Sequence, residues 1–92
     1  MAKGLNNNGY VLFIFSRKSG KVVKCIEGIS SALLRLYALN STSATRDSVI
    51  VNKDDNTIDF YCEGKKNDMP TICKEMEGMN AEKIGINVLE IF

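Results

Sequence analysis

The chain has 92 residues, of which 45% are hydrophobic and 25% charged, with twelve basic and eleven acidic side chains and a formal net charge of +1. This length predicts a single domain, 1–92, with a modest core, and the composition excludes general disorder. The near balance of charge argues against a dedicated nucleic-acid binder, which usually carries a clear basic excess. The absence of histidine removes the commonest general base and the usual zinc ligand.

The polar start of the chain, residues 1–9, is rich in asparagine, and we predict that it is disordered. The apolar run 10–15 behind it is too short for a signal-peptide core or a membrane span, which favours a cytoplasmic protein without membrane contact. Cys25, Cys62 and Cys73 form no CxxC pair, so we expect reduced cytosolic thiols.

The amino-acid usage carries a clue about source. Asn, Lys and Ile occur nine times each and Arg three times, and the favoured residues have AT-rich codons. We therefore expect a low-GC bacterium, or a phage or mobile element that lives in one.

An internal similarity appears when the chain is compared with itself at an offset of thirty-six residues. Ile14 then meets Ile50, and the pair Glu27-Gly28 meets Glu63-Gly64. A fixed-period similarity indicates one supersecondary unit used twice, here over about 10–40 and 46–78.

Each unit reads as a β-hairpin followed by a helix. In the first, the strands 10–15 and 21–26 flank a turn at 18–20, and Ser30 and Ser31 are candidate caps of the helix. The helix positions that we assign to the core are Ala32, Leu33, Leu36, Tyr37 and Leu39.

The second unit has strands at 48–51 and 57–62 around the turn Asp54-Asp55-Asn56. A helix is predicted from Asp68 to Gly78, with Pro70 in its first turn. Its apolar residues follow the i, i+3, i+4, i+7 rule and are Met69, Ile72, Cys73 and Met76.

The tail, 84–91, alternates apolar and small or polar residues and is predicted as a fifth strand. The fold class is therefore α+β, with duplicated hairpin–helix units in the order ββαββαβ and two helices on one face of an antiparallel sheet. An alternative reads 22–36 as one long helix. The residues that share a helix face in this reading are Val22, Cys25, Ile26, Ile29, Leu33 and Leu36. That pattern predicts a ferredoxin-like βαββαβ fold.

The leading strands are apolar at consecutive positions, so both of their faces require cover. Two helices cover only one face of the sheet. The apolar residues on the other face predict a homodimer or higher oligomer, because few monomers expose so large an apolar patch. The alternative is that the last strand or the linker 40–45 folds across it.

The two expected helix starts are candidate sites for an anion, because helix N-termini offer free N–H groups and a favourable dipole. A small phosphate-bearing, nucleotide-like ligand is the chemistry that they fit. The predicted ligand-binding residues are Gly28, Ser30, Ser31, Gly64, Lys65, Lys66 and Thr71.

Three other groups are weaker candidates. Cys25 lies beside Lys24, which could stabilise a thiolate, although a packed strand cysteine is the simpler interpretation. Glu27 and Glu63 occupy equivalent positions in the repeat and could hold a metal or share acid–base work. No complete catalytic set, metal site or cofactor motif is present in the sequence.

We therefore expect a non-enzymatic, homo-oligomeric binding protein without cofactors. It would capture a host protein or a small anionic ligand and so inhibit or regulate a host process. The alternative is a nucleic-acid-binding module that uses basic hairpins and the sheet aromatics Phe60 and Tyr61. The basic residues concerned are Arg17, Lys18, Lys21, Lys24, Lys53, Lys65 and Lys66.

Overall fold

The computed structural model describes residues 9–43, 45–64, 72–74 and 76–91. The chain forms two strands, one full helix, three more strands and a C-terminal segment with two short helical turns. The elements are β1 (Tyr10–Ser16), β2 (Val22–Gly28), α2 (Ser31–Ser41), β3 (Arg46–Asn52), β4 (Thr57–Glu63), β5 (Ile72–Lys74), the 3-10 helix η1 (Ala81–Ile84) and α3 (Val88–Ile91).

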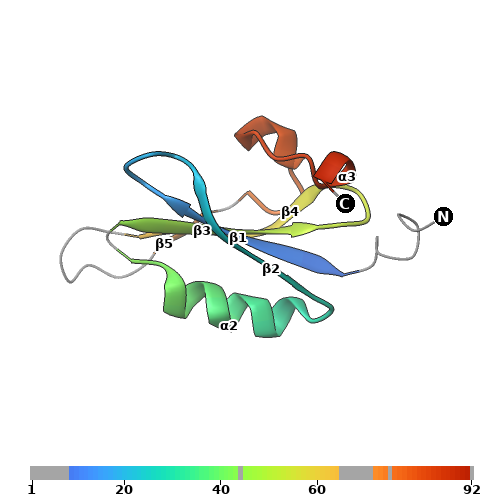
Figure 1. Ribbon diagram of the computed structural model, residues 1–92. Helices are drawn as coiled ribbons and strands as arrows, with labels where there is room; N and C mark the ends of the chain where they lie inside the picture. The colour runs from blue at the N-terminus through green and yellow to red at the C-terminus, as the bar shows by residue number, and fades with distance from the viewer. Residues whose placement is uncertain (1–8, 44, 65–71, 75, 92) are drawn as a thin grey trace.

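The strands form one antiparallel sheet in the order β2-β1-β3-β4-β5, which confirms the α+β class. Helix α2 lies on one face of this sheet, and the C-terminal segment lies on the other (Figure 1). Strands β1 and β3 are therefore the middle layer of a three-layer arrangement. This position explains why their sequences are apolar at consecutive residues, because each strand is buried on both faces.

Two hydrophobic clusters fill the two sides of the sheet. Toward α2, alternate residues of β1 and β3 pack with two helix residues, and this cluster comprises Leu12, Ile14, Leu34, Ala38 and Ile50. The cluster on the opposite face joins the other strand positions to the C-terminal segment and comprises Val11, Phe13, Val49, Val51, Ile58, Ala81, Ile86 and Val88.

The first hairpin and helix form as their local sequence predicts. Gly20 adopts a left-handed φ of 72° in the turn between β1 and β2, a conformation that suits glycine. The Ser30 side chain accepts a hydrogen bond from the N–H of Leu33 and caps α2. The observed strand Val22–Gly28 contradicts the ferredoxin-like alternative, which required a helix there.

The predicted second helix is wrong in the part of the chain that is described. Ile72–Lys74 forms strand β5, which pairs with β4, and Glu77 and Gly78 lie in a turn. The rest of that prediction falls on residues outside the described ranges. Helical spacing of four apolar residues is a local signal, whereas the unpaired edge of β4 offers hydrogen bonds that only the assembled sheet supplies. The duplicated hairpin–helix unit and the two helices on one face are therefore not confirmed.

The predicted C-terminal strand is also wrong. The segment forms η1, a left-handed Gly85 with φ of 84°, and the single turn α3, whose first N–H groups include that of Leu89 bonded to the Asn87 side chain. Ile86 and Val88 are still buried against the sheet. The alternation of apolar and polar residues in the tail correctly predicted that these two side chains are buried on one side. An irregular segment can show the same alternation as a strand.

A buried asparagine in the β3–β4 turn holds this segment in place. Asn56 is 1% exposed and has a left-handed φ of 59°. Its side-chain nitrogen donates to the carbonyl oxygen of Ile86 at 3.0 Å, and its side-chain oxygen accepts from the N–H of Val88 at 3.0 Å. Its backbone carbonyl accepts from the N–H of Ala81 at 2.8 Å. The turn was predicted, and this clamp was not.

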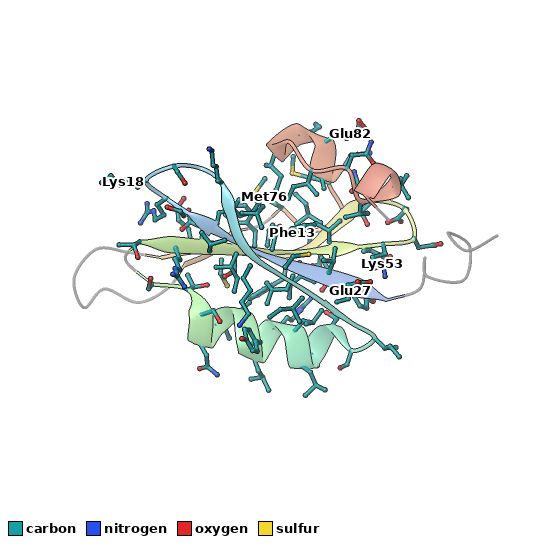
Figure 2. All side chains as sticks on the ribbon, viewed as in Figure 1. Phe13, Lys18, Glu27, Lys53, Met76 and Glu82 are labelled. Atoms are coloured by element: carbon teal, nitrogen blue, oxygen red, sulfur yellow. The ribbon has the colours of Figure 1, made fainter. Side chains whose placement is uncertain are left out.

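The C-terminal segment also changes the argument for an oligomer. The second apolar face of the sheet was expected to need a second copy, yet the chain covers it with its own residues, as the alternative interpretation allowed. Figure 2 shows Phe13 and Met76 on this side of the sheet, between the strands and the C-terminal turns. Any self-association must use another surface.

Candidate functional site

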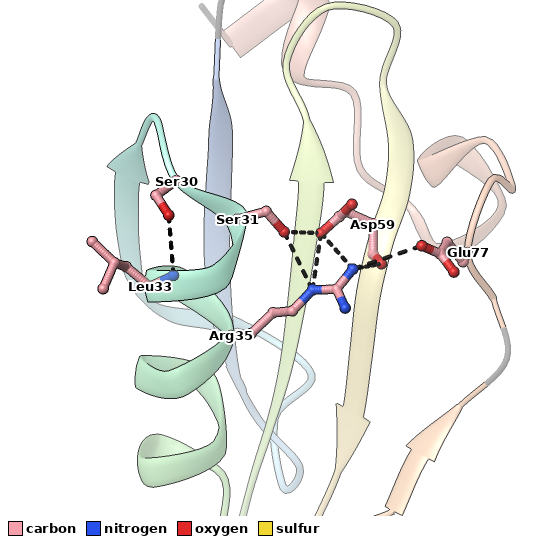
Figure 3. Close-up of polar contacts among 6 residues, drawn as sticks. All are labelled: Ser30, Ser31, Leu33, Arg35, Asp59 and Glu77. Carbon is pink, nitrogen blue, oxygen red and sulfur yellow. Dashed lines mark hydrogen bonds and ion pairs between the residues drawn. The ribbon is translucent and has the colours of Figure 1, made fainter.

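The start of α2, predicted as an anion site, is occupied by the protein's own groups. Ser30 caps the helix, and Ser31 donates a hydrogen bond to the carboxylate of Asp59 on β4 (Figure 3). A carboxylate at a helix N-terminus satisfies the same dipole that an external anion would. The two serines therefore stabilise the fold, and the helix start offers less to a phosphate than its sequence suggests.

Arg35 extends this contact into a network between three parts of the chain. Its guanidinium lies 3.1 Å from the Asp59 carboxylate and donates to the Asp59 carbonyl oxygen at 3.2 Å. It also lies 3.6 Å from the carboxylate of Glu77 and stacks 5.0 Å from the centre of the Phe60 ring. The Arg35 guanidinium and the Asp59 carboxylate thus each have partners within the protein, and the cluster joins α2 to β4 and the C-terminal segment.

The loop after β4, the second predicted anion site, is also closed internally. The Gly64 N–H donates to the Asp47 carboxylate at 3.0 Å, and the Gly64 carbonyl accepts from Arg17. Gly64 is buried, and a Cβ there would lie 1.7 Å from the Ser43 carbonyl oxygen. Its glycine is therefore required by close backbone packing. The remaining predicted residues of this site lie outside the described ranges and are Lys65, Lys66 and Thr71.

The two predicted sites do not come together. Gly28 pairs with Tyr10 at one end of the sheet, whereas Gly64 follows β4 at the opposite end, beside Ser43. Strands of this length separate their ends by about 20 Å. A single ligand of nucleotide size therefore does not reach both loops.

Glu27 and Glu63 are separated in the same way. The Glu27 carboxylate forms an ion pair with Lys53, with Nζ and Oε1 2.5 Å apart, and Figure 2 shows the two side chains side by side. Within the described part of the chain, no group of three or more metal-ligating side chains is present. The pairing gives Glu27 a structural role at the end of β2.

Two cysteines have informative positions. Cys25 is exposed on β2, and partial burial, with a smaller contribution from the Glu27 carboxylate, raises the pKa of its thiol above the ordinary value. A raised pKa is the opposite of what a nucleophilic cysteine needs. Cys62 is buried and lies directly opposite Cys73 in the β4–β5 register, a proximity that their sequence spacing did not reveal.

The basic residues of the first hairpin are exposed, but the aromatics expected to accompany them are not available. Lys18 lies at the tip of the β1–β2 hairpin (Figure 2), and Lys21 and Lys24 are also exposed. Phe60 packs in the cluster beneath α2, and Tyr61 packs against the opposite cluster. The sheet therefore offers no open stacking platform at these two positions.

The buried face of α2 differs from the face that its sequence predicts. The helix buries Leu34 and Ala38, whereas the residues assigned to the core face outward. The helix is apolar on nearly every side, so periodicity alone could not select its buried face. The exposed large apolar residues on α2, before it and on β2 are Val22, Val23, Ile29, Leu33, Leu36, Tyr37 and Leu39.

No protein-family model matches the chain, and comparisons with curated proteins and with solved structures found no match. Among the described residues, no helix is both long and apolar enough to cross a membrane.

Proposed function

We propose that the chain is a small, homo-oligomeric binding protein without catalytic activity, which captures a host protein and thereby inhibits or regulates a host process. The observation that carries this proposal is the difference between the two edges of the sheet. Edge strand β2 has seven residues, whereas edge strand β5 has three. A long unpaired edge is a template for another strand, and short edges are one way in which proteins avoid such pairing.

The outer edge of β2 presents backbone groups for pairing. The backbone N–H of Lys53 donates to the Gly9 carbonyl oxygen. Because residues of an antiparallel ladder alternate in the direction of their backbone groups, the N–H and carbonyl of Phe13 point toward β3. Its partner Cys25 therefore directs its N–H and carbonyl away from β1, toward the open edge. Among the described strands, none pairs with this edge.

The edge also lacks the usual protection. Charged side chains on an edge discourage pairing, but both charged residues of β2 are engaged within the protein. Lys24 donates to the Tyr37 hydroxyl at 2.7 Å, and Glu27 pairs with Lys53. A bulge at Val23 disturbs only the start of the strand.

Charge indicates what kind of segment would pair there. Residues 17–28 contain four basic side chains and one acidic side chain, Glu27, which is already paired. We therefore expect the captured segment to be extended and acidic, so that β-augmentation supplies affinity and charge supplies orientation.

The test uses a substitution that removes a hydrogen-bond donor from the outer edge. Cys25→Pro removes an N–H that points away from β1, whereas Cys25→Ala is the matched control that retains it. The probe is a synthetic extended peptide of alternating Glu and Val, measured by isothermal titration calorimetry. We expect binding to wild type and Cys25→Ala, with a loss of at least ten-fold for Cys25→Pro. Equal binding by all three proteins, or none by wild type, would refute capture at β2.

The nucleic-acid alternative retains one favourable observation, the exposed lysines of the first hairpin. Binding of single-stranded DNA or RNA at low salt that is lost in a Lys18→Ala/Lys21→Ala variant would support it. Absence of binding at low salt would remove it. Capture of a small anion has less support, because the Asp59 and Asp47 carboxylates occupy the predicted sites.

A further inference from the structure

We infer that the outer face of α2 is a homodimer interface, at which the helix packs against the same helix of a second copy. This deepens the oligomeric part of the proposed function and does not depend on target capture by β2. The starting observation is the exposure of three apolar side chains, with Ile29 88%, Leu33 68% and Leu36 60% accessible.

Two of these side chains form a stripe on the outer side of α2, and the third precedes the helix. Leu33 and Leu36 follow the i, i+3 spacing, which places them on one side of α2, whereas Ile29 lies just before the N-cap Ser30, whose backbone is extended. Leu34 and Ala38, on the other side, are buried beneath the sheet. Figure 2 shows side chains that project from α2 away from the strands, on the side opposite the C-terminal segment. Tyr37 and Leu39 flank the stripe and are 41% and 42% accessible.

The area of this surface is close to what a dimer requires. The five partly exposed side chains present on the order of 500 Å² of apolar surface. Two copies that cover each other would bury about 1,000 Å² together, which is near the lower bound for a specific interface. A monomer that left this patch in water would expose as much as the largest patches of ordinary soluble proteins.

The charge pattern favours a second copy over an unlike partner. Arg35 is the only charged residue of α2, and it is directed toward Asp59 on the sheet side. The helix has no acidic residue in its first turn and no basic residue in its last. Two such helices packed antiparallel bring no charged residue of α2 against its own copy, and their dipoles run in opposite directions. Lys24 of β2, which donates to the Tyr37 hydroxyl, lies at the border of this surface. A two-fold axis then pairs each stripe with itself.

This geometry leaves the proposed binding edge accessible. The stripe is on the side of α2 that faces away from the sheet, whereas β2 is an edge strand of the sheet. Packing of the two helices therefore does not cover the outward backbone groups of Cys25. The dimer would carry two β2 edges. Capture by the dimer is then bivalent, which raises the avidity for a target with two segments.

Sedimentation equilibrium of the full chain tests the inference. We expect wild type to sediment with twice the chain mass of 10.2 kDa at micromolar concentration. A Leu33→Glu/Leu36→Glu variant should sediment as a monomer, because the two-fold axis brings the introduced carboxylates together in an apolar interface. Leu89→Glu, which changes an exposed leucine of α3, is the matched control and should remain dimeric.

Circular dichroism establishes that each variant is folded. Should the double glutamate variant fail to fold, Leu36→Cys replaces it, and oxidative cross-linking through residue 36 under native conditions is the expected result. A wild-type monomer at all concentrations up to about 1 mM would overturn the inference. So would a dimer that survives Leu33→Glu/Leu36→Glu and is lost in Cys25→Pro, since that result assigns the interface to β2 and leaves peptide capture to be judged by its own titration.

Discussion

The two faces of the sheet are covered in different ways. On one face, the regular helix α2 contributes two buried apolar residues, Leu34 and Ala38, and leaves a second apolar surface outside. On the other face, an irregular segment buries Ala81, Ile86 and Val88 and is held by the side chain of Asn56. A helix satisfies its own backbone, so its outer face remains available for other contacts. An irregular segment depends on the surrounding protein for its hydrogen bonds.

One of the two largest effects is expected at the clamp of the irregular face. Asn56→Ala leaves the Val88 N–H and the Ile86 carbonyl without their partner and places a Cβ-bearing residue without a polar side chain at positive φ. We expect a loss of about 3 kcal/mol in the free energy of unfolding. Urea denaturation measures it.

Asn56→Gly is the matched control, because glycine tolerates the same φ but also lacks the clamp. It should be more stable than Asn56→Ala by about 1 kcal/mol. Wild-type stability in both variants would show that the C-terminal segment does not depend on this side chain.

The helical face offers a comparison between adjacent residues. Leu34→Ala opens a cavity beneath the sheet and should lower the free energy of unfolding by about 2–4 kcal/mol. Leu33→Ala, one position away and 68% accessible, should change it by less than about 0.5 kcal/mol in the monomer. Thermal unfolding at low concentration, where a dimer dissociates, measures both. Equal losses at the two positions would contradict the assignment of the buried face.

A smaller effect is expected where the two faces are linked. Asp59→Asn retains the size of the side chain but removes the charge that Arg35 and Ser31 contact. We expect a loss of about 1 kcal/mol, since the pair is partly solvated and Arg35 still has Glu77 nearby. Stability unchanged in both low and high salt would show that the network contributes nothing.

The smallest effect concerns reactivity rather than stability. Because burial and Glu27 raise the pKa of the Cys25 thiol, less thiolate is present at neutral pH than in an ordinary exposed cysteine. Alkylation of Cys25 by iodoacetamide should be slower than that of a model thiol at pH 7 and should increase until pH exceeds the raised pKa. Glu27→Gln should accelerate it modestly. Peptide mass spectrometry measures the rate at this site, and faster reaction than the free thiol at pH 7 would contradict the assignment.

The sequence by itself determined the local elements. Both hairpins, the Asp54-Asp55-Asn56 turn, the cap at Ser30 and the start of α2 depend on residues close together in the chain, and all of them appear in the structure. Turn conformations and helix caps are formed by neighbouring residues, so sequence patterns report them directly.

Only the tertiary structure decided the rest. Residues 72–74 form a strand because the open edge of β4 pairs with them. The tail forms an irregular segment over the second face of the sheet because Asn56 bonds to its backbone and the apolar residues of that face pack against it. The buried side of α2 was selected in the same way, since its apolar residues surround the helix and only contact with Leu12, Ile14 and Ile50 distinguishes them. Each of these choices depends on surfaces supplied by residues distant in sequence, and a local periodicity contains no information about which surface is available.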